Sequence, residues 1–455
     1  MSGRDVERDL LEFFERAQTP EPSARLRGAT AMARLQAGPV RRGGPRDARL
    51  GLSLVGLAAS IVLTAGVLIV LANHANSTVL GPGHSASPSA QASMHTFGLI
   101  PSPSPSPSPS PTDTPAPIVS MGPPHTFTAA GPMDAPYTLS ALLPDGSVLV
   151  TGDSSGQRPL GAELFDPATG RFSPTGSPSA THDYGTATTL ADGRVLVAGG
   201  TDPLSQTPTN VAEIYDPKTG TFTGTGSMAD SQWGQVAILL RDRRVLIVGG
   251  DRDGSPTSAE LYDPSSGLFT PIAGPSTARY GCMATRLSDG RVLVVGGWVA
   301  GPANSGTAAT LTSAEVFDPA TDRFKPVGST AHQHYSGTLT LLQDGRVLTI
   351  GGGTAVELFD PTSGKFGPTA SMDLARLGAT ATLLRDGRVL IAGGSVELAS
   401  TNLVDLASAE IYDPRTGKFS KTGSMSEPLP GATATLLQDG RVLIASGGSA
   451  ELYQP

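Results

Sequence analysis

One pattern occurs seven times between residues 123 and 455 and constrains the fold more than any other feature of this chain. Each copy has a turn dipeptide, then an apolar stretch that in most copies ends in Gly-Gly, then a stretch that in five copies has the form Ala-Glu-aliphatic-aromatic-Asp-Pro and in the other two is VELFDP (356–361) and AELYQP (450–455). The dipeptide is Asp-Gly at 145–146, 192–193, 289–290, 344–345, 386–387 and 439–440, and Asp-Arg at 242–243. Copies 42 to 55 residues apart leave room for four short antiparallel strands, so each copy predicts one blade of a β-propeller.

The order of the strands predicts how the ring closes. We name the expected strands a (before the turn dipeptide), b (after it), c (the Ala-Glu stretch) and d (centred on Phe). Strand d follows strand c in six copies, with its Phe at 172, 222, 269, 324, 366 and 419. The seventh copy ends at strand c, but residues 124–131 read as a strand d with Phe127 in the Phe position. We therefore expect an all-β, seven-bladed propeller whose last blade takes its outer strand from the N-terminal side of the domain.

The repeated charged residues are expected to serve the scaffold. The Glu of strand c occurs once per blade, so we expect it to accept backbone N–H bonds near the Gly-Gly turns. The Arg that starts strand b is expected to pair with the Asp at the end of strand c, such as Arg194 with Asp216.

The repeat resembles the kelch repeat, in which paired glycines follow an apolar strand and an aromatic-Asp-Pro strand comes next. The resemblance covers residues 123–455, and it departs from the family in one place, because the aromatic of the last strand is Phe where the family usually has Trp. It implies a propeller of six or seven blades used mainly for binding. The Asp-Gly-Arg-Val form with Gly-Gly is also similar to the central propeller of galactose oxidase.

Charge and cysteine content exclude other classes. Residues 123–455 hold 22 Lys and Arg against 32 Asp and Glu, so the propeller is acidic and would repel a nucleic-acid backbone. A single cysteine, Cys282, excludes an intramolecular disulfide framework and a CxxC metal or redox site.

Residues 50–72 are an uncharged apolar run of 23 residues, which is long enough to cross a bilayer as a helix. Arg41, Arg42, Arg46 and Arg49 precede it, so we expect the N-terminus in the cytoplasm and the propeller outside the cell membrane. The alternative is a signal peptide that is removed, but 49 residues before the run and the poor cleavage match at 72–75 favour a retained anchor.

The segments on either side of this run are predicted to form a short helix and a linker. Residues 1–49 contain one stretch, residues 4–18, with apolar residues at helical spacing. This helix could contact a cytoplasmic regulator, as in bacterial anti-sigma factors, or lie on the membrane, or belong to a disordered tail. Residues 73–122 read as a disordered linker in which residues 101–111 alternate Pro and Ser, a composition typical of an extended spacer.

The candidate binding residues lie where strand a begins, at the expected mouth of the central channel. Aromatic residues recur there, with polar residues beside them; we expect this set to contact a glycan, peptide or protein ligand: Tyr137, Tyr184, Trp233, Tyr280, Tyr335, His182, His332, His334, Arg279, Arg376 and, from a b–c loop, Trp298. Asp183 and Asp251 lie near them. The alternative is that the aromatic residues only fill the channel.

No catalytic residue, cofactor or metal site is predicted. The likeness to galactose oxidase would imply a copper held by tyrosines and histidines, with one Tyr linked to a Cys. Tyr335 stands where a Tyr-His pair would begin, but the next residue is Ser336. Tyr184 or Tyr280 could take the place of the linked Tyr, but Cys282 is two residues from Tyr280 on the same expected strand. His332 and His334 could bind a metal, but they lack a third ligand. We therefore expect a binding protein, with a transmembrane sensor and a copper oxidase as alternatives.

Overall fold

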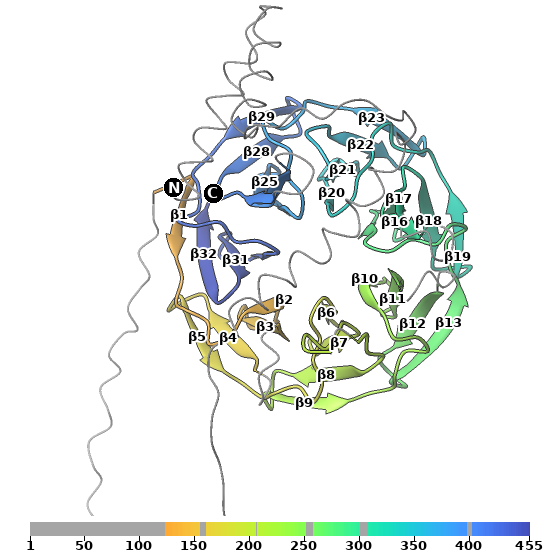
Figure 1. Cartoon of the computed structure of the whole chain (residues 1–455), viewed down its shortest axis with the longest axis vertical. Helices are drawn as coiled ribbons and strands as arrows, with labels where there is room; N and C mark the ends of the chain where they lie inside the picture. Colours follow the sequence, from red (N-terminus) through yellow and green to blue (C-terminus); the bar gives the residue numbers. More distant parts are fainter. Residues whose placement is uncertain (1–122, 155–160, 206, 252–257, 301–307, 398–402) are drawn as a thin grey trace, which may run out of the picture.

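The structure is a computed structural model, and it describes residues 123–154, 161–205, 207–251, 258–300, 308–397 and 403–455. These residues form seven four-stranded antiparallel sheets arranged as a closed ring, which confirms the seven-bladed all-β propeller (Figure 1). No helix long and apolar enough for a bilayer is present within these ranges. The expected cytoplasmic segment, anchor and linker at 1–49, 50–72 and 73–122 lie outside the described residues.

Each blade contributes one strand to each of four concentric positions. The innermost strands are β2 (Tyr137–Leu142), β6 (Thr186–Thr189), β10 (Trp233–Leu239), β14 (Met283–Arg286), β20 (Thr338–Leu341), β24 (Thr380–Leu383) and β30 (Thr433–Leu436). The second strands are β3 (Val148–Asp153), β7 (Val195–Ala198), β11 (Val245–Asp251), β15 (Val292–Val295), β21 (Val347–Ile350), β25 (Val389–Ala392) and β31 (Val442–Ser446). The third strands are β4 (Glu163–Asp166), β8 (Ala212–Asp216), β12 (Ser258–Asp263), β18 (Ala314–Asp318), β22 (Glu357–Asp360), β28 (Ala409–Asp413) and β32 (Ser449–Gln454). The outer strands are β5 (Arg171–Pro174), β9 (Thr221–Gly224), β13 (Leu268–Ala273), β19 (Arg323–Pro326), β23 (Lys365–Pro368), β29 (Lys418–Lys421) and β1 (Thr126–Ala129). We number the blades 1 to 7 in the order of their innermost strands.

Blade 7 joins the two ends of the propeller, as the sequence predicts. Strand β1 pairs antiparallel with β32, and Phe127 lies opposite Tyr453. Their rings are 4.9 Å apart, and Figure 1 shows β1 in orange beside the blue β32. Every described sheet of the ring therefore has four strands, and the strand that completes blade 7 comes from the N-terminal side of blade 1.

The core lies between neighbouring blades. The second strand of blade 2, β7, is buried on both faces: Leu196 packs toward blade 3, whereas Val195 and Val197 pack toward blade 1. This alternation follows from the two-residue period of a strand. Across the interface between blades 1 and 2, the hydroxyl of Tyr215 in blade 2 lies 2.8 Å from the hydroxyl of Thr175, which follows the outer strand of blade 1. Equivalent Thr–Tyr pairs recur between later blades.

The a–b and c–d turns lie on one side of the ring, which we call the regular face. In the a–b turn of blade 2, Gly193 has a φ of 90°, and Asp192 Oδ1 accepts the N–H of Arg194 at 3.1 Å. Arg243, the exception to the Asp-Gly pattern, adopts a φ of 76° in the corresponding turn. This left-handed conformation is unfavourable for a residue with a Cβ, so the hairpin is imposed by its strands.

The expected pairing of the strand-b Arg with strand c is wrong. Arg194 pairs with Asp192 of its own turn, with Nη2 2.7 Å from Oδ2. Asp216 instead accepts the backbone N–H of Lys218 at 2.9 Å and so stabilises the c–d turn. The turn Asp is only two residues from the Arg, so its carboxylate lies within reach of the guanidinium, whereas the strand-c Asp accepts a hydrogen bond from the backbone of the c–d turn.

The opposite side, the variable face, carries the b–c loops and the junctions between blades. Two of these loops contain additional hairpins that the sequence did not predict. Strands β16 (Trp298–Ala300) and β17 (Ala308–Thr310) form one above blade 4, and β26 (Ser395–Glu397) and β27 (Leu403–Asp405) form one above blade 6.

We expect Phe127→Ala to lower the free energy of unfolding by about 1–2 kcal/mol, because it removes a half-buried ring from the sheet that closes the propeller. Urea denaturation followed by tryptophan fluorescence measures this change. Thr128→Ala, on the exposed side of the same strand, is the control and should change stability by less than about 0.5 kcal/mol. Equal stability of Phe127→Ala and the wild type would contradict closure through β1.

Candidate binding site at the channel mouth

Seven buried glutamates hold the segments that lead into the blades. Each is the Glu of strand c, and each accepts a backbone N–H from the junction before the innermost strand of its own blade, at donor–acceptor distances of 2.6 to 3.1 Å. The glutamates are Glu163, Glu213, Glu260, Glu315, Glu357, Glu410 and Glu451. Their expected scaffold role is therefore what the structure shows.

A second contact to six of the seven glutamates comes from one position, three residues after the N–H donor; we call it the Glu-binding position, and in blade 7 it is occupied by the apolar Leu429. It is occupied in blades 1 to 6 by Tyr137, His182, Gln232, Arg279, His334 and Arg376. In blade 4, Arg279 donates to Glu315 at 3.2 Å and to the carbonyl of Gly296 at 3.1 Å. The side chain thus joins strand c to the end of strand b.

Five of the predicted ligand contacts occupy this position and are buried. Tyr137 is 4% exposed, and His182, Arg279, His334 and Arg376 are each 1% exposed. These side chains therefore stabilise the blades from inside and are not accessible to a ligand at the surface. The sequence predicts these residues at the mouth, but it could not show that their side chains point inward.

In blades 2, 3 and 5 the pKa of the Glu depends on its partner at the Glu-binding position. Burial raises the pKa of Glu213, but hydrogen bonds from His182 and the Ser179 N–H outweigh it, so the net pKa lies below the ordinary value. Glu357 behaves in the same way with Ala331 N–H and His334. In blade 3 the partner is the neutral Gln232, so burial dominates and raises the pKa of Glu260.

The remaining aromatic residues form an arc along the mouth. Gly234 donates its N–H to the carbonyl of Tyr184 at 3.2 Å, and Gly281 donates to the carbonyl of Gly234 at 3.3 Å. These bonds join the starts of the innermost strands of blades 2, 3 and 4, so Tyr184, Trp233 and Tyr280 follow one another around the ring. Tyr184 is 61% exposed, and Trp233 is half-buried.

Three aromatic residues from blades 4 and 5 come together as a cluster, which we call the aromatic cluster: Tyr280, Trp298 and Tyr335. The rings of Tyr280 and Trp298 are stacked with centroids 5.8 Å apart, and the Tyr335 ring lies 5.1 Å from Trp298 at an angle of 52°. Two backbone hydrogen bonds of 2.9 Å between Tyr280 and Trp298 tie the additional hairpin of blade 4 to the ring.

Gly281 makes room for this cluster. It has a φ of 57°, and a Cβ added to it would lie 2.7 Å from the Trp298 indole. A larger residue at this position would therefore displace the indole. All three aromatic residues remain partly exposed, so the cluster has an accessible aromatic surface.

A hollow of about 440 Å³ begins beside the cluster, at the residue that follows Tyr335. Its wall comes from the innermost strands of blades 5, 6 and 7 and consists of small residues: Ser336, Gly337, Thr338, Gly378, Ala379, Thr380, Ala381, Ala432 and Ala434. The wall thus offers hydroxyl groups and methyl groups in place of bulky side chains. This volume is in the range of small-molecule sites in proteins.

Two exposed polar side chains lie near Tyr335, and we call their position the rim. The side chain of His332 is 59% exposed, with Nδ1 3.6 Å from Glu357. Glu397 is exposed on the additional hairpin of blade 6, and its charge acts on Tyr335, whose pKa is raised first by burial and second by Glu397. Sequence reasoning missed Glu397, because only the fold brings the hairpin of blade 6 over blade 5.

The described residues do not fit the copper site that the likeness to galactose oxidase would imply. Both ring nitrogens of His182 face oxygens, Gly199 O at 2.8 Å and Glu213 at 3.1 Å, and His334 is held in the same way. Burial raises the pKa of the Cys282 thiol to about 11. Within the described ranges, no three His, Cys, Asp or Glu side chains gather as a metal site.

We expect Glu213→Gln to lower the free energy of unfolding at pH 7 by about 1–3 kcal/mol, because it weakens a charged hydrogen bond in the interior. A folded-state pKa below the unfolded value of about 4.3 gives stability that is present above pH 4.3 and lost as the pH falls, so the loss should shrink at pH 3.5. Urea titrations at both pH values measure this.

Glu260→Gln is the matched control. The pKa of Glu260 is raised, so its ionised form contributes no such stability at neutral pH, and the Gln variant should lose less at pH 7 than Glu213→Gln. Equal losses that do not depend on pH in both variants would contradict a charge contribution from the His182 pair.

Comparisons with known proteins agree with this architecture. Residues 184–229, which contain the four strands of blade 2 and part of the junction to blade 3, match the kelch motif. A similar solved structure is a fungal alcohol oxidase of the AA5 family in complex with copper, with 18% sequence identity, a TM-score of 0.58, and coverage of 73% of this chain and 76% of that chain. At this identity the likeness concerns the fold. No curated protein matches. The chain is a seven-bladed β-propeller with a kelch motif in its repeats, a scaffold that fits a binding or interaction module.

Proposed function

We propose that this protein is a membrane-anchored binding module whose propeller lies outside the cell and takes up a ligand at the channel mouth, without catalysis. The observation that carries the proposal is the aromatic cluster beside the 440 Å³ hollow. Partly exposed stacked aromatic rings beside a concave space with hydroxyl groups in its wall are unusual for a purely structural surface.

The chemistry of the mouth favours a glycan over a peptide or protein ligand. The C–H face of a sugar ring can pack on Trp298 or Tyr335, while its hydroxyls can bond to Ser336 and Thr338 and to the rim carboxylate of Glu397. A peptide could also pack its side chains on these rings, but the Ala and Gly residues of the wall offer few hydrogen-bond partners for a peptide backbone. A folded protein would contact the rim and not the hollow.

Binding without catalysis is the simpler proposal for the described residues. The buried side chains at the Glu-binding position contact the strand-c glutamates, and the exposed polar side chains near Tyr335, His332 and Glu397, come from different blades. The copper oxidase remains the enzyme alternative because of the AA5 structure. Metal analysis of the purified chain decides between them: stoichiometric copper would overturn the binding-only proposal.

The location outside the cell rests on the uncharged run at 50–72 and the arginines before it. In this arrangement the Pro-Ser linker would hold the propeller away from the membrane, and residues 1–49 would face any cytoplasmic regulator.

We expect Trp298→Ala and Tyr335→Ala each to weaken glycan binding at least about tenfold, since stacking on one ring contributes on the order of 1–3 kcal/mol. A glycan and peptide array probed with the full chain in detergent identifies the ligand, and calorimetry measures the affinity of the variants. Trp233→Ala, farther along the arc, should have a smaller effect.

Leu268→Ala is the control, because Leu268 is 60% exposed on the outer strand β13, away from the mouth. It should leave affinity unchanged. Unaltered affinity in all three aromatic variants, with folding intact by circular dichroism, would remove the mouth as the binding site.

Protease accessibility tests the topology. If residues 50–72 form a retained anchor, the chain should stay in the membrane fraction after alkaline washing, and protease added to intact cells should release the propeller. Release of the chain into the medium without protease would indicate a cleaved signal peptide instead.

A further inference from the structure

The regular face contains a recurring device that joins neighbouring blades. The Arg that starts strand b donates Nε to the Asp of its own turn and Nη2 to the carbonyl of the Asp-Pro proline in the next blade. Three blades show both bonds. The bond from Nε to the turn Asp is 2.8 or 2.9 Å long in all three. The bond from Nη2 to the proline carbonyl is 3.5 Å for Arg194–Pro264, 3.1 Å for Arg244–Pro319 and 2.6 Å for Arg441–Pro167. A guanidinium thus bridges a carboxylate and a carbonyl of two different blades.

The guanidinium also lies beside an aromatic residue of the next blade. Arg194 is close enough to Tyr262 for the two to interact electrostatically, and Arg346 has the same relation to Tyr412. The site that receives the guanidinium therefore has three parts: a turn Asp, a proline carbonyl and the buried Tyr of the following blade.

Blade 1 lacks this Arg, because Ser147 stands in its place. The Ser147 hydroxyl and N–H both donate to Asp145 Oδ1, at 2.6 and 3.0 Å, and the side chain is too short to reach blade 2. Within the described residues, Asp145 Oδ2 and the carbonyl of Pro217 receive no hydrogen bond. The charge of Asp145 nevertheless acts on Tyr215 of blade 2, so all three parts of the receiving site are present.

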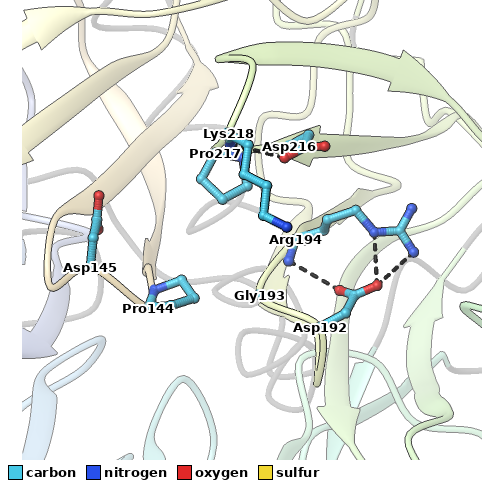
Figure 2. A pocket seen from close by; sticks show the side chains of 8 residues that line it. All are labelled: Pro144, Asp145, Asp192, Gly193, Arg194, Asp216, Pro217 and Lys218. Carbon is cyan, nitrogen blue, oxygen red and sulfur yellow. Dashed lines mark hydrogen bonds and ion pairs between the residues drawn. The ribbon is translucent and has the colours of Figure 1, made fainter.

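A cavity of about 360 Å³ lies between blades 1 and 2, and both Asp145 and Pro217 line it (Figure 2). It is lined by residues of blades 1 and 2: Pro144, Asp145, Asp192, Gly193, Arg194, Asp216, Pro217 and Lys218. Arg194 is paired with Asp192, so it does not neutralise Asp145. With three carboxylates against two cations, the lining has a net charge of −1.

We propose that this cavity, the blade 1–2 pocket, binds the guanidinium group of an arginine side chain presented by a partner polypeptide. The ligand chemistry follows from the chain itself, because the same carboxylate and carbonyl hold a guanidinium between other blades. A lysine ammonium matches the site less well, since it cannot present two parallel N–H donors in a fixed plane. The pocket opens on the regular face, so it is independent of the channel mouth and of the proposed glycan.

Titration of the full chain in detergent with capped Gly-Arg-Gly and Gly-Lys-Gly peptides, followed by calorimetry, tests the proposal. We expect the Arg peptide to bind at least about tenfold more tightly than the Lys peptide, and Asp145→Asn to weaken Arg binding at least about tenfold, because a charged hydrogen bond is lost. Equal affinity for the two peptides would overturn the proposal of a guanidinium site.

Ser147→Arg is the sharpest variant, because it restores the repeat and fills the pocket from within. It should abolish Arg-peptide binding and raise the urea midpoint of unfolding. Ser173→Arg adds the same charge at an exposed position of β5 and should leave peptide affinity unchanged. Unchanged binding in Ser147→Arg, or equal loss in Ser173→Arg, would show that the pocket is not the receptor; glycan binding at the mouth is expected to persist in every variant.

Discussion

The pairing of β1 with β32 fixes the geometry on which every other feature depends. Four residue pairs, from Thr126 with Gln454 to Ala129 with Glu451, join two ends of the propeller that are more than 300 residues apart. Closure completes the seventh blade, and the number of blades sets the width of the channel that the innermost strands surround. The spacing of the aromatic residues at the mouth follows from this width, because each one begins or precedes an innermost strand.

Within the closed ring, the buried glutamates determine which side chains reach the mouth. Each Glu fixes the junction before strand a by a backbone hydrogen bond, and in blades 1 to 6 the residue three positions later contacts the same carboxylate. In blades 3, 4 and 5 the residue four positions later is a partly exposed aromatic residue at the mouth: Trp233, Tyr280 and Tyr335. This one-residue step explains why Tyr137, at the inward position, is buried while Tyr335 belongs to the aromatic cluster.

Repetition makes the departures informative. Identical blades would leave a uniform disc with no distinct site, so recognition has to arise where a copy differs. On the variable face the differences are the additional hairpins of blades 4 and 6, which bring Trp298 and Glu397 to the mouth. On the regular face the difference is a missing side chain, Ser147 in place of Arg, which leaves a formed receiving site without its guanidinium. The candidate site of the variable face therefore depends on additional hairpins, whereas that of the regular face depends on a shorter side chain at one repeat position.

The sequence by itself determined the number of blades, the role of each strand, the Phe127 strand in blade 7 and the scaffold role of the glutamates. These features are local and periodic, so spacing alone reveals them. Only the tertiary structure decided that His182, Arg279, His334 and Arg376 point inward, that Arg194 reaches Pro264, and that the hollow lies beside Tyr335. The physical reason is that these contacts join different strands or blades, often across 30 to 70 residues, and neighbours along the chain do not reveal which face meets which.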